Sequence, residues 1–247
     1  MKIFAGTSGF AYKEWKGSFY PEKISPNEML RSYSGRLTSV EINNTFYHMP
    51  KRDLLSSWAG QVPDGFVFAL KAPQVITHFK RLRNVRDETE YLFGTLPLLG
   101  AKLGPVLFQF PKSFRADRSL LSDFLAMLPA DAACAFEFRS PTWLTDEVLD
   151  LLRAKGCSLC VADSDEAPAK EIVSTAGWGY LRLRRSDYAE AELAQWAERV
   201  LSEAWQRAFV FFKHEGDEAR GPKLAMQFQK MVDAEGRIGT KPLKKAG

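Results

Sequence analysis

Residues 39–50 read SVEINNTFYHMP, and this stretch decides how the chain folds. Val40 and Ile42 form the apolar side of a predicted strand, whereas Glu41 and Asn43 alternate with them on the other side. One explanation is an ordinary surface strand whose polar side lies in water. A second explanation is a strand whose polar side faces the inside of a closed barrel. The other strands of the chain distinguish between the two.

Eight short segments, including this one, are rich in β-branched and aromatic residues and therefore predict strands. They are KIFAGTS (2–8), TSVEIN (38–43), FVFALK (66–71), PVLFQF (105–110), ACAFEF (133–138), SLCVAD (158–163), YLRLR (180–184) and AFVFFK (208–213). Helix-sized segments separate most of them, which is typical of a single-domain α/β fold, the TIM-type (β/α)8 barrel, here over residues 1–235. The alternative is a doubly wound open sheet. It usually has a G-x-G-x-x-G turn after its first strand, which GTSGF (6–10) does not supply.

Five segments predict helices by their apolar spacing and their end residues. They cover residues 25–34, 87–103, 117–128, 145–156 and 191–205. The sequence SPNE (25–28) predicts a capping box, and Thr145 and Gly156 are typical of a helix start and end. The connection through 53–58 is the shortest, and the helix after the sixth strand has the weakest pattern. The polar, basic tail (236–247) is expected to be flexible.

The composition fits a large globular domain, because 45% of the 247 residues are hydrophobic and 13% are aromatic. The net charge of +4, from 34 basic and 30 acidic residues, is too small to indicate nucleic acid or a membrane by itself. No apolar run approaches the roughly 18 residues of a membrane helix. Met1 is followed by a strand-like segment rather than a leader. We therefore expect a cytoplasmic protein with no membrane partner; the sequence implies no oligomeric state.

The cysteines are interpreted as structural. Their number, three, is odd and does not make a disulfide framework. Cys157 and Cys160 form a C-x-x-C, which redox and metal sites also use. However, they lie in an apolar strand-like segment, and no second pair completes a zinc site.

Several predicted strands carry polar residues on one side at their C-terminal ends. In 133–138, for example, Glu137 shares a side with two alanines, and Cys134 shares the other with two phenylalanines. In a barrel the polar sides would converge at the C-terminal mouth, where TIM-barrel active sites lie. The converging residues would be Glu41, Asn43, Lys71, Gln109, Glu137, Arg139, Asp163 and Arg182. The alternative is a buried salt-bridge network that only seals the barrel. We favour a functional site, because burying so many charges contributes little stability.

Five longer motifs identify a family resemblance. They are GTSGFAYKEWKGSFYP, VEINNTFYHMP, KAPQVITH, GPVLFQFP and FEFRSPTW, spread in this order over roughly residues 3–215. Together they resemble the YecE-like family, domain of unknown function 72. The resemblance implies a TIM-barrel-like fold without implying a particular reaction. The residues here that fall on the family's motifs are Gly6, Thr7, Ser8, Gly9, Tyr12, Trp15, Glu41, Asn43, Phe46, Tyr47, Lys71, His78, Gln109, Glu137, Arg139 and Trp143.

The chain departs from the family pattern in two places. After the seventh strand Arg184 stands where the family tends to have His, and the eighth strand lacks the usual Asn pair. One interpretation is that Lys213 or His214 substitutes for the missing residues, and the alternative is that their local function is lost.

The polar residues suggest acid/base chemistry on an anion. Glu41 and Glu137 are the candidate acid and base, provided that their surroundings push their pKa values apart. Lys71 and His78 would assist them as electrostatic or proton-transfer groups. The chemistry would be that of a hydrolase, a lyase or an isomerase.

The candidate substrate-binding residues are polar, basic or aromatic. Guanidinium groups suit phosphate or carboxylate, and aromatic rings can stack on a base or a sugar. The set is Thr7, Ser8, Tyr12, Trp15, Asn43, Tyr47, Gln109, Arg139, Asp163 and Arg182. These residues predict a small anionic ligand, phosphorylated or nucleotide-like. The alternative is a non-catalytic module that binds nucleic acid or nucleotides with the same surface.

The sequence does not identify a cofactor. His78, Glu41, Glu137 and Asp163 have donor atoms suited to a divalent metal. However, the chain has three histidines, and none belongs to a tight motif such as H-E-x-x-H. A metal is therefore not favoured.

Overall fold

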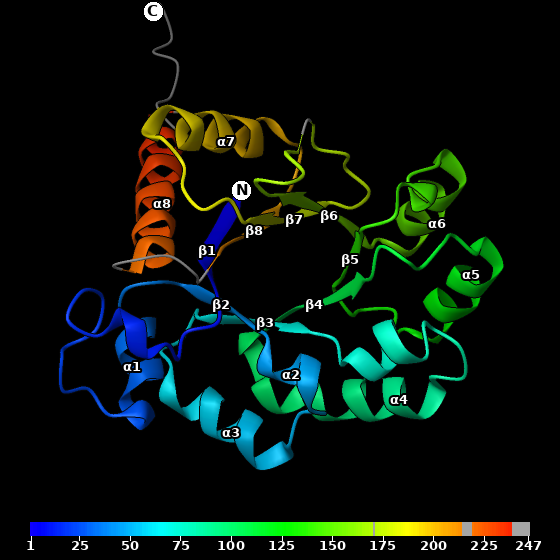
Figure 1. Ribbon diagram of the computed structural model, residues 1–247, viewed down its shortest axis with the longest axis horizontal. Coiled ribbons are helices and arrows are strands. Elements are labelled where there is room, and N and C mark those ends of the chain that lie inside the picture. The colour runs from blue at the N-terminus through cyan, green and yellow to red at the C-terminus, as the bar shows by residue number, and fades with distance from the viewer. Residues whose placement is uncertain (170, 214–218, 239–247) are drawn as a thin grey trace, which may run out of the picture.

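A computed structural model describes residues 1–169, 171–213 and 219–238. Its centre is a closed barrel of eight parallel strands in sequential order, which confirms the predicted (β/α)8 fold (Figure 1). The strands are β1 (Lys2–Ser8), β2 (Ser39–Ile42), β3 (Val67–Lys71), β4 (Leu103–Phe110), β5 (Cys134–Phe138), β6 (Ser158–Asp163), β7 (Trp178–Leu183) and β8 (Arg207–Phe212). Each end lies within two residues of its predicted position.

The helices surround the barrel on the outside (Figure 1). They are α1 (Met29–Ser34), α2 (Asn44–Tyr47), α3 (Arg52–Gln61), α4 (Arg86–Thr95), α5 (Arg118–Met127), α6 (Asp146–Lys155), α7 (Glu190–Ser202) and α8 (Arg220–Ile238). Short 3-10 or π turns are η1 (Lys13–Trp15), η2 (Pro26–Glu28), η3 (Val75–Phe79), η4 (Leu96–Lys102) and η5 (Pro141–Trp143). The predicted capping box at Ser25 and the left-handed C-cap at Gly156 are both present.

Three features of the helical layer differ from the prediction. The predicted helix 87–103 ends as an α-helix at Thr95, because Pro97 cannot continue the hydrogen-bonding pattern, and a 3-10 turn follows. No helix occurs between β6 and β7 in the described residues 164–169 and 171–177. Helix α8 was not among the predicted helices. It runs to Ile238, and the predicted tail beyond it, residues 239–247, lies outside the described residues.

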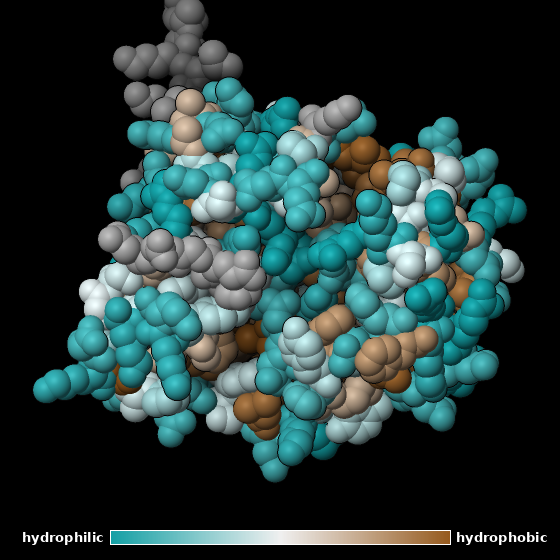
Figure 2. Space-filling model, in the orientation of Figure 1, coloured by the Kyte–Doolittle hydropathy of each residue, from teal (hydrophilic) through white to brown (hydrophobic). Residues whose placement is uncertain are grey.

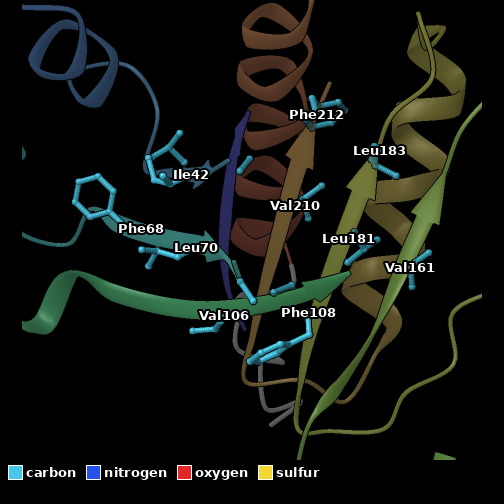
Figure 3. Close-up of a cluster of buried hydrophobic side chains, with 14 of the residues drawn as sticks. Ile42, Phe68, Leu70, Val106, Phe108, Val161, Leu181, Leu183, Val210 and Phe212 are labelled. Carbon is cyan, nitrogen blue, oxygen red and sulfur yellow. The ribbon is translucent and has the colours of Figure 1, made fainter. Parts of the chain in front are cut away.

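The strands separate two hydrophobic cores. On their outer sides, apolar residues pack against the helices, as the side chains labelled in Figure 3 show. Val40 and Ile42 belong to this outer core, as the opening motif predicted. The inner core fills the barrel itself. It consists of Phe4, Val67, Ala69, Leu107, Ala135, Cys160, Trp178, Tyr180, Phe209 and Phe211.

The three cysteines are buried free thiols, as expected for structural residues. Cys157 belongs to the outer core and Cys160 to the inner core, so the two thiols of the C-x-x-C lie on opposite sides of the sheet. Across the described residues, we find no helix with both the length and the apolar character that a membrane crossing requires.

Candidate functional site

The C-terminal mouth of the barrel is organised around one buried arginine. Arg182 on β7 bridges two carboxylates that come from β2 and β5. Its Nη2 lies 2.9 Å from Glu41 Oε1, and its Nη1 lies 2.6 Å from Glu137 Oε2. All three side chains are at most 4% exposed. The alternation of polar and apolar residues thus placed these three side chains on the inner face, as predicted.

Glu41 has further hydrogen-bond donors on both oxygens. The hydroxyl of Tyr180 donates to Oε2 at 2.8 Å, and Ser8 Oγ donates to Oε1 at 2.8 Å. Asn43 Nδ2 adds a longer contact of 3.4 Å to Oε1. Burial, followed by the charge of Glu41, raises the pKa of Tyr180 well above its usual value, so the phenol keeps its proton and remains a donor.

Glu137 is held in a similar way. Gln109 Nε2 donates to Oε1 at 3.1 Å, and Arg139 Nε donates to the same oxygen at 3.2 Å. Gln109 lies opposite Glu137 in the β4–β5 register, which explains why the two side chains meet. The side chain of Arg139 is 52% exposed and extends towards the solvent.

The two glutamates are both ionised at neutral pH. Burial alone would raise the pKa of Glu41, but the charge of Arg182 and its hydrogen bond outweigh burial and lower it. Burial likewise raises the pKa of Glu137, and Arg182 and Arg139 together lower it to about 2. The surroundings therefore do not push the two pKa values apart, as an acid/base pair requires. The structure thus assigns neither carboxylate the proton-donor role predicted from the sequence.

Arg182 differs from its predicted role as an anion clamp. It is 2% exposed, and both terminal nitrogens are bonded to glutamates. A ligand in solution cannot reach a guanidinium buried in this way. Its place in the mouth is to hold Glu41 and Glu137 ionised.

A second group of side chains forms the rim of the mouth. The ammonium of Lys71 lies 3.9 Å from the ring centre of Phe46, a cation–π contact. His78 meets the same ring edge-on at 4.9 Å, and its Nδ1 lies 2.9 Å from Thr77 Oγ1. Tyr47, which is 63% exposed, packs against Phe46 from another side at 5.1 Å.

The backbone explains how the rim is assembled. Lys71 is the last residue of β3, and Thr45 Oγ1 donates to its carbonyl at 2.7 Å. This bond ties β3 to the short helix α2, which carries Phe46. His78 lies in the π turn η3 that follows β3, and turns of this kind often occur at functional sites.

The rim residues carry lowered pKa values. Burial, followed by the charge of Arg182, lowers the pKa of Lys71 to about 8. Burial and the neighbouring charges of Lys71 and Arg139 lower the pKa of His78. His78 is therefore neutral at physiological pH, and Lys71 can exchange a proton there.

A cavity of about 690 Å³ opens beside these groups. Among the described residues, its lining includes His78, Lys112, Glu137, Arg139, Ala162, Asp163, Asp165, Glu166, Arg184 and Lys213. Ala162 is the residue opposite Arg182 in the β6–β7 register, and its small side chain leaves this space open. In Figure 2, hydrophilic residues gather over the middle of the ring of strands that Figure 1 shows from the same direction.

The described cavity lining holds basic and acidic side chains in equal number. The basic residues are Lys112, Arg139, Arg184 and Lys213, and the acidic ones are Glu137, Asp163, Asp165 and Glu166. Glu137 is bonded to Arg182 and Arg139, and Asp163 lies 2.9 Å from Arg185.

Two predicted site residues lie elsewhere. Thr7 Oγ1 contacts the hydroxyl of Tyr33 at 2.9 Å, on the outer side of β1. Trp15 is 1% exposed and packs in the outer core. Asp163 lines the same cavity as Glu137. However, it is bonded to Arg185 and Tyr188 and not to Arg182.

The remaining predicted residues shape the edge of the mouth. Gly9, with a φ of 90°, turns the chain after β1, and its N–H donates to the carbonyl of Glu41 at 2.8 Å. Tyr12 supports this turn by donating its hydroxyl to the Ser8 carbonyl at 2.9 Å. A Cβ at position 9 would lie 2.2 Å from the Tyr12 hydroxyl, so the turn requires glycine.

Sequence reasoning missed Tyr180 and Lys112. Tyr180 lies two residues before Arg182 and therefore on the same side of β7, so alternation could have identified it. Lys112 follows β4 in a loop, where no periodic signal marks it. Of the residues at the departures from the family pattern, Arg184 and Lys213 line the cavity, and His214 lies outside the described residues.

A metal site is not evident in the residues that the structure describes. Among them, no group of three or more His, Cys, Asp or Glu residues is arranged to hold an ion.

Comparison with known proteins identifies the family. Residues 4–246 match the profile described as "Protein of unknown function DUF72". The chain belongs to the DUF72 family. The resemblance inferred from the sequence motifs is thereby confirmed.

Two curated relatives are both named UPF0759 proteins. UPF0759 protein YunF of Bacillus subtilis is 28% identical over 176 residues, which are 66% of this DUF72 chain and 61% of YunF. UPF0759 protein YecE of Escherichia coli K12 is 35% identical over 115 residues, which are 45% of this chain and 42% of YecE. The matched region thus spans less than two thirds of either relative.

Solved structures of DUF72 proteins share the fold. One from Thermotoga maritima has a TM-score of 0.82 and 27% identity, covering 94% of this chain and 100% of that protein. One from Enterococcus faecalis has a TM-score of 0.76 and 18% identity, covering 94% and 95%. The second likeness shows the fold alone.

Proposed function

We propose that the mouth is the active site of an enzyme that acts on a small anionic substrate, phosphorylated or nucleotide-like. The observation that carries this proposal is the rim lysine. Lys71, which has a pKa of about 8, contacts the same Phe46 ring as His78, and His78 lines a cavity with four basic side chains in its described lining. Proton-exchanging groups with shifted pKa values in a cleft are typical of catalytic sites. Their position at the C-terminal ends of barrel strands supports the same conclusion.

Proton transfer falls to Lys71 and His78 in this proposal. Both lie against Phe46, and the pKa of each is lowered, to about 8 for Lys71. Glu41 and Glu137 stay ionised and shape the electrostatic field instead. The reaction would be a hydrolysis, an elimination or an isomerisation, each of which needs a proton to be moved.

Anion binding falls chiefly to Arg139. Its Nε donates to Glu137, and within the described part of the chain no protein acceptor meets its terminal nitrogens. Two parallel N–H groups of a guanidinium can bind a phosphate group in a bidentate manner. Arg139 lines the cavity and is half-exposed, so it is accessible to a ligand.

The test is calorimetric titration of inorganic pyrophosphate into the wild-type chain and two variants. We expect Arg139→Ala to weaken binding by about tenfold or more, because one charge-assisted bidentate contact contributes about 1.5–3 kcal/mol. Arg153→Ala is the matched control. Arg153 is also half-exposed and also bonded to a carboxylate, but it lies on α6 away from the cavity. Equal affinities for wild type and Arg139→Ala would contradict the proposal.

The same titration distinguishes the alternative, a nucleic-acid-binding module. Single-stranded DNA of increasing length replaces pyrophosphate in a second series at several salt concentrations. Affinity that increases with length and falls steeply with log salt would favour the module, because phosphate contacts release counterions. We expect little dependence on polymer length.

A further inference from the structure

The amine of Lys71 differs in its hydrogen bonding from the amines of two other lysines, Lys102 and Lys155. Lys102 Nζ donates to the carbonyls of Ala59 and Val62 at 2.7 Å, and Lys155 Nζ donates to the carbonyl of Leu128 at 2.7 Å. Such bonds occupy the N–H groups of the amine. Within the described residues, Lys71 Nζ has no acceptor at hydrogen-bond distance.

The surroundings of Lys71 disfavour its ammonium form. It is mostly buried, and it shares the mouth with the positive charges of Arg182 and Arg139. Glu41 and Glu137 act in the opposite direction, but both are bonded to Arg182, and the effect of burial dominates. A lysine that is desolvated and close to other cations is activated as a nucleophile. With a pKa of about 8, about a tenth of Lys71 is neutral at pH 7.

We infer that Lys71 is an amine nucleophile that forms a Schiff base with a phosphorylated aldehyde or ketone. The inference rests on the proposed function, because it places the phosphate of the substrate at Arg139. It adds a covalent step and restricts the substrate class to carbonyl compounds.

The step balances without an oxidant or a reductant. The neutral Nζ attacks the carbonyl carbon, a C–N bond forms, and the carbonyl electron pair moves to oxygen. This oxygen takes up one proton that the attacking nitrogen releases and a second proton from outside the two reactants. The nitrogen lone pair then forms the C=N bond as the C–O bond breaks and water leaves. The product is a protonated imine, so the sum is amine plus carbonyl plus one proton giving iminium plus water.

His78 is positioned to move these protons. Thr77 Oγ1 lies 3.5 Å from the carbonyl of Pro73 and donates to it, which leaves the hydroxyl as the acceptor for His78 Nδ1–H. This arrangement favours an unprotonated Nε2. The His78 ring packs against Phe46, whose ring also contacts the Lys71 ammonium. His78 lines the cavity.

The test traps the imine chemically. The wild-type chain is incubated at pH 7.4 with glyceraldehyde 3-phosphate or with unphosphorylated glyceraldehyde, in the presence of cyanoborohydride, which reduces an imine to a stable secondary amine. Mass spectrometry of peptides then gives the labelling rate at each lysine. We expect Lys71 to be labelled at least about tenfold faster than Lys155, because the pKa of Lys71 is lowered to about 8 and Lys155 Nζ is bonded to the carbonyl of Leu128. A Lys71 rate no greater than that of Lys155 would overturn the inference.

Two variants make the result specific. Lys71→Arg keeps the positive charge but has no amine that forms an imine, so labelling at this position must vanish while pyrophosphate binding persists. Arg139→Ala is expected to reduce labelling by the phosphorylated probe about tenfold and to leave labelling by glyceraldehyde unchanged. Equal labelling by both probes in the wild type would contradict the inference that the substrate carries a phosphate group.

The outcomes separate this inference from the proposed function. If pyrophosphate binds through Arg139 but no imine forms at Lys71, the Schiff base is refuted and the anion site stands. If an imine forms at Lys71 with both probes and pyrophosphate does not bind, the nucleophile stands and the anion site is refuted.

Discussion

Arg182 is the residue on which the interior of the mouth depends. It is fully enclosed and bonded to two glutamates from different strands. Removing one partner of a buried ion pair leaves uncompensated charge in a medium that solvates it poorly. Here the loss of Arg182 would leave two such charges.

We expect Arg182→Met to lower the free energy of unfolding by about 3–5 kcal/mol or more, the range observed when a buried pair is broken. Chemical denaturation monitored by circular dichroism measures the change. Arg153→Met is the control, since its pair with Asp150 is exposed and contributes about 0–1 kcal/mol. A similar small effect for both variants would show that the buried network contributes little.

Individual side chains were partly predictable from the sequence. Alternation along the strands placed Glu41, Glu137 and Arg182 correctly on the inner face, because a strand repeats every two residues. It did not reveal that the three bond to one another, since strand register sets that contact. Asp163 lines the cavity with Glu137, but alternation did not reveal that it bonds to Arg185 and Tyr188, because the loop after β7 supplies those partners.

At the scale of elements, the β6–β7 connection is the exception in the barrel. It has no helix among its described residues, and polar contacts at both ends hold it instead. At one end Asp163 accepts from the N–H of Ala169 and from the hydroxyl of Tyr188. At the other, Thr175 Oγ1 accepts from the N–H of Leu159 and donates to the carbonyl of Cys157.

We expect Asp163→Asn to destabilise the protein by about 1.5–3 kcal/mol, because the replacement keeps the volume but removes charge-assisted hydrogen bonds. Limited proteolysis should then cut the connection, residues 164–177, before the rest of the chain. Asp150→Asn on α6 is the matched control and should change the free energy by no more than about 0.5 kcal/mol. Unchanged protease resistance in Asp163→Asn would refute this role.

Strands were easier to predict than helices in this chain. Each strand is a short apolar run, and burial on both sides makes that signal strong. Helix α8 was missed because Gly221 and Pro222 suggest a turn. They lie in the first turn of the helix, where proline is tolerated. Whether Gly221 and Pro222 lie in a turn or in a helix depends on tertiary packing rather than on the local sequence.

At the scale of the whole molecule, the residues that stabilise the barrel differ from the polar residues at its mouth. Two apolar cores, one inside the strands and one outside, hold the fold together. The polar network around Arg182 lies above the inner core and keeps Glu41 and Glu137 ionised. In the proposed function, Lys71 and His78, whose pKa values are lowered, are the groups at the rim that exchange protons.

This arrangement couples anion binding to the protonation of Lys71. A bound anion favours the ammonium form, so it must raise the lowered pKa of Lys71. By the same coupling, anion affinity must fall as the pH rises through about 8, where Lys71 loses its charge in the free protein.

The most direct test is an NMR titration of the Lys71 side chain in protein with isotopically labelled lysine, assigned by the Lys71→Arg variant. We expect a midpoint near pH 8 without ligand and a higher midpoint with saturating pyrophosphate. An ordinary lysine midpoint of about 10.4 that pyrophosphate leaves unchanged would contradict the account.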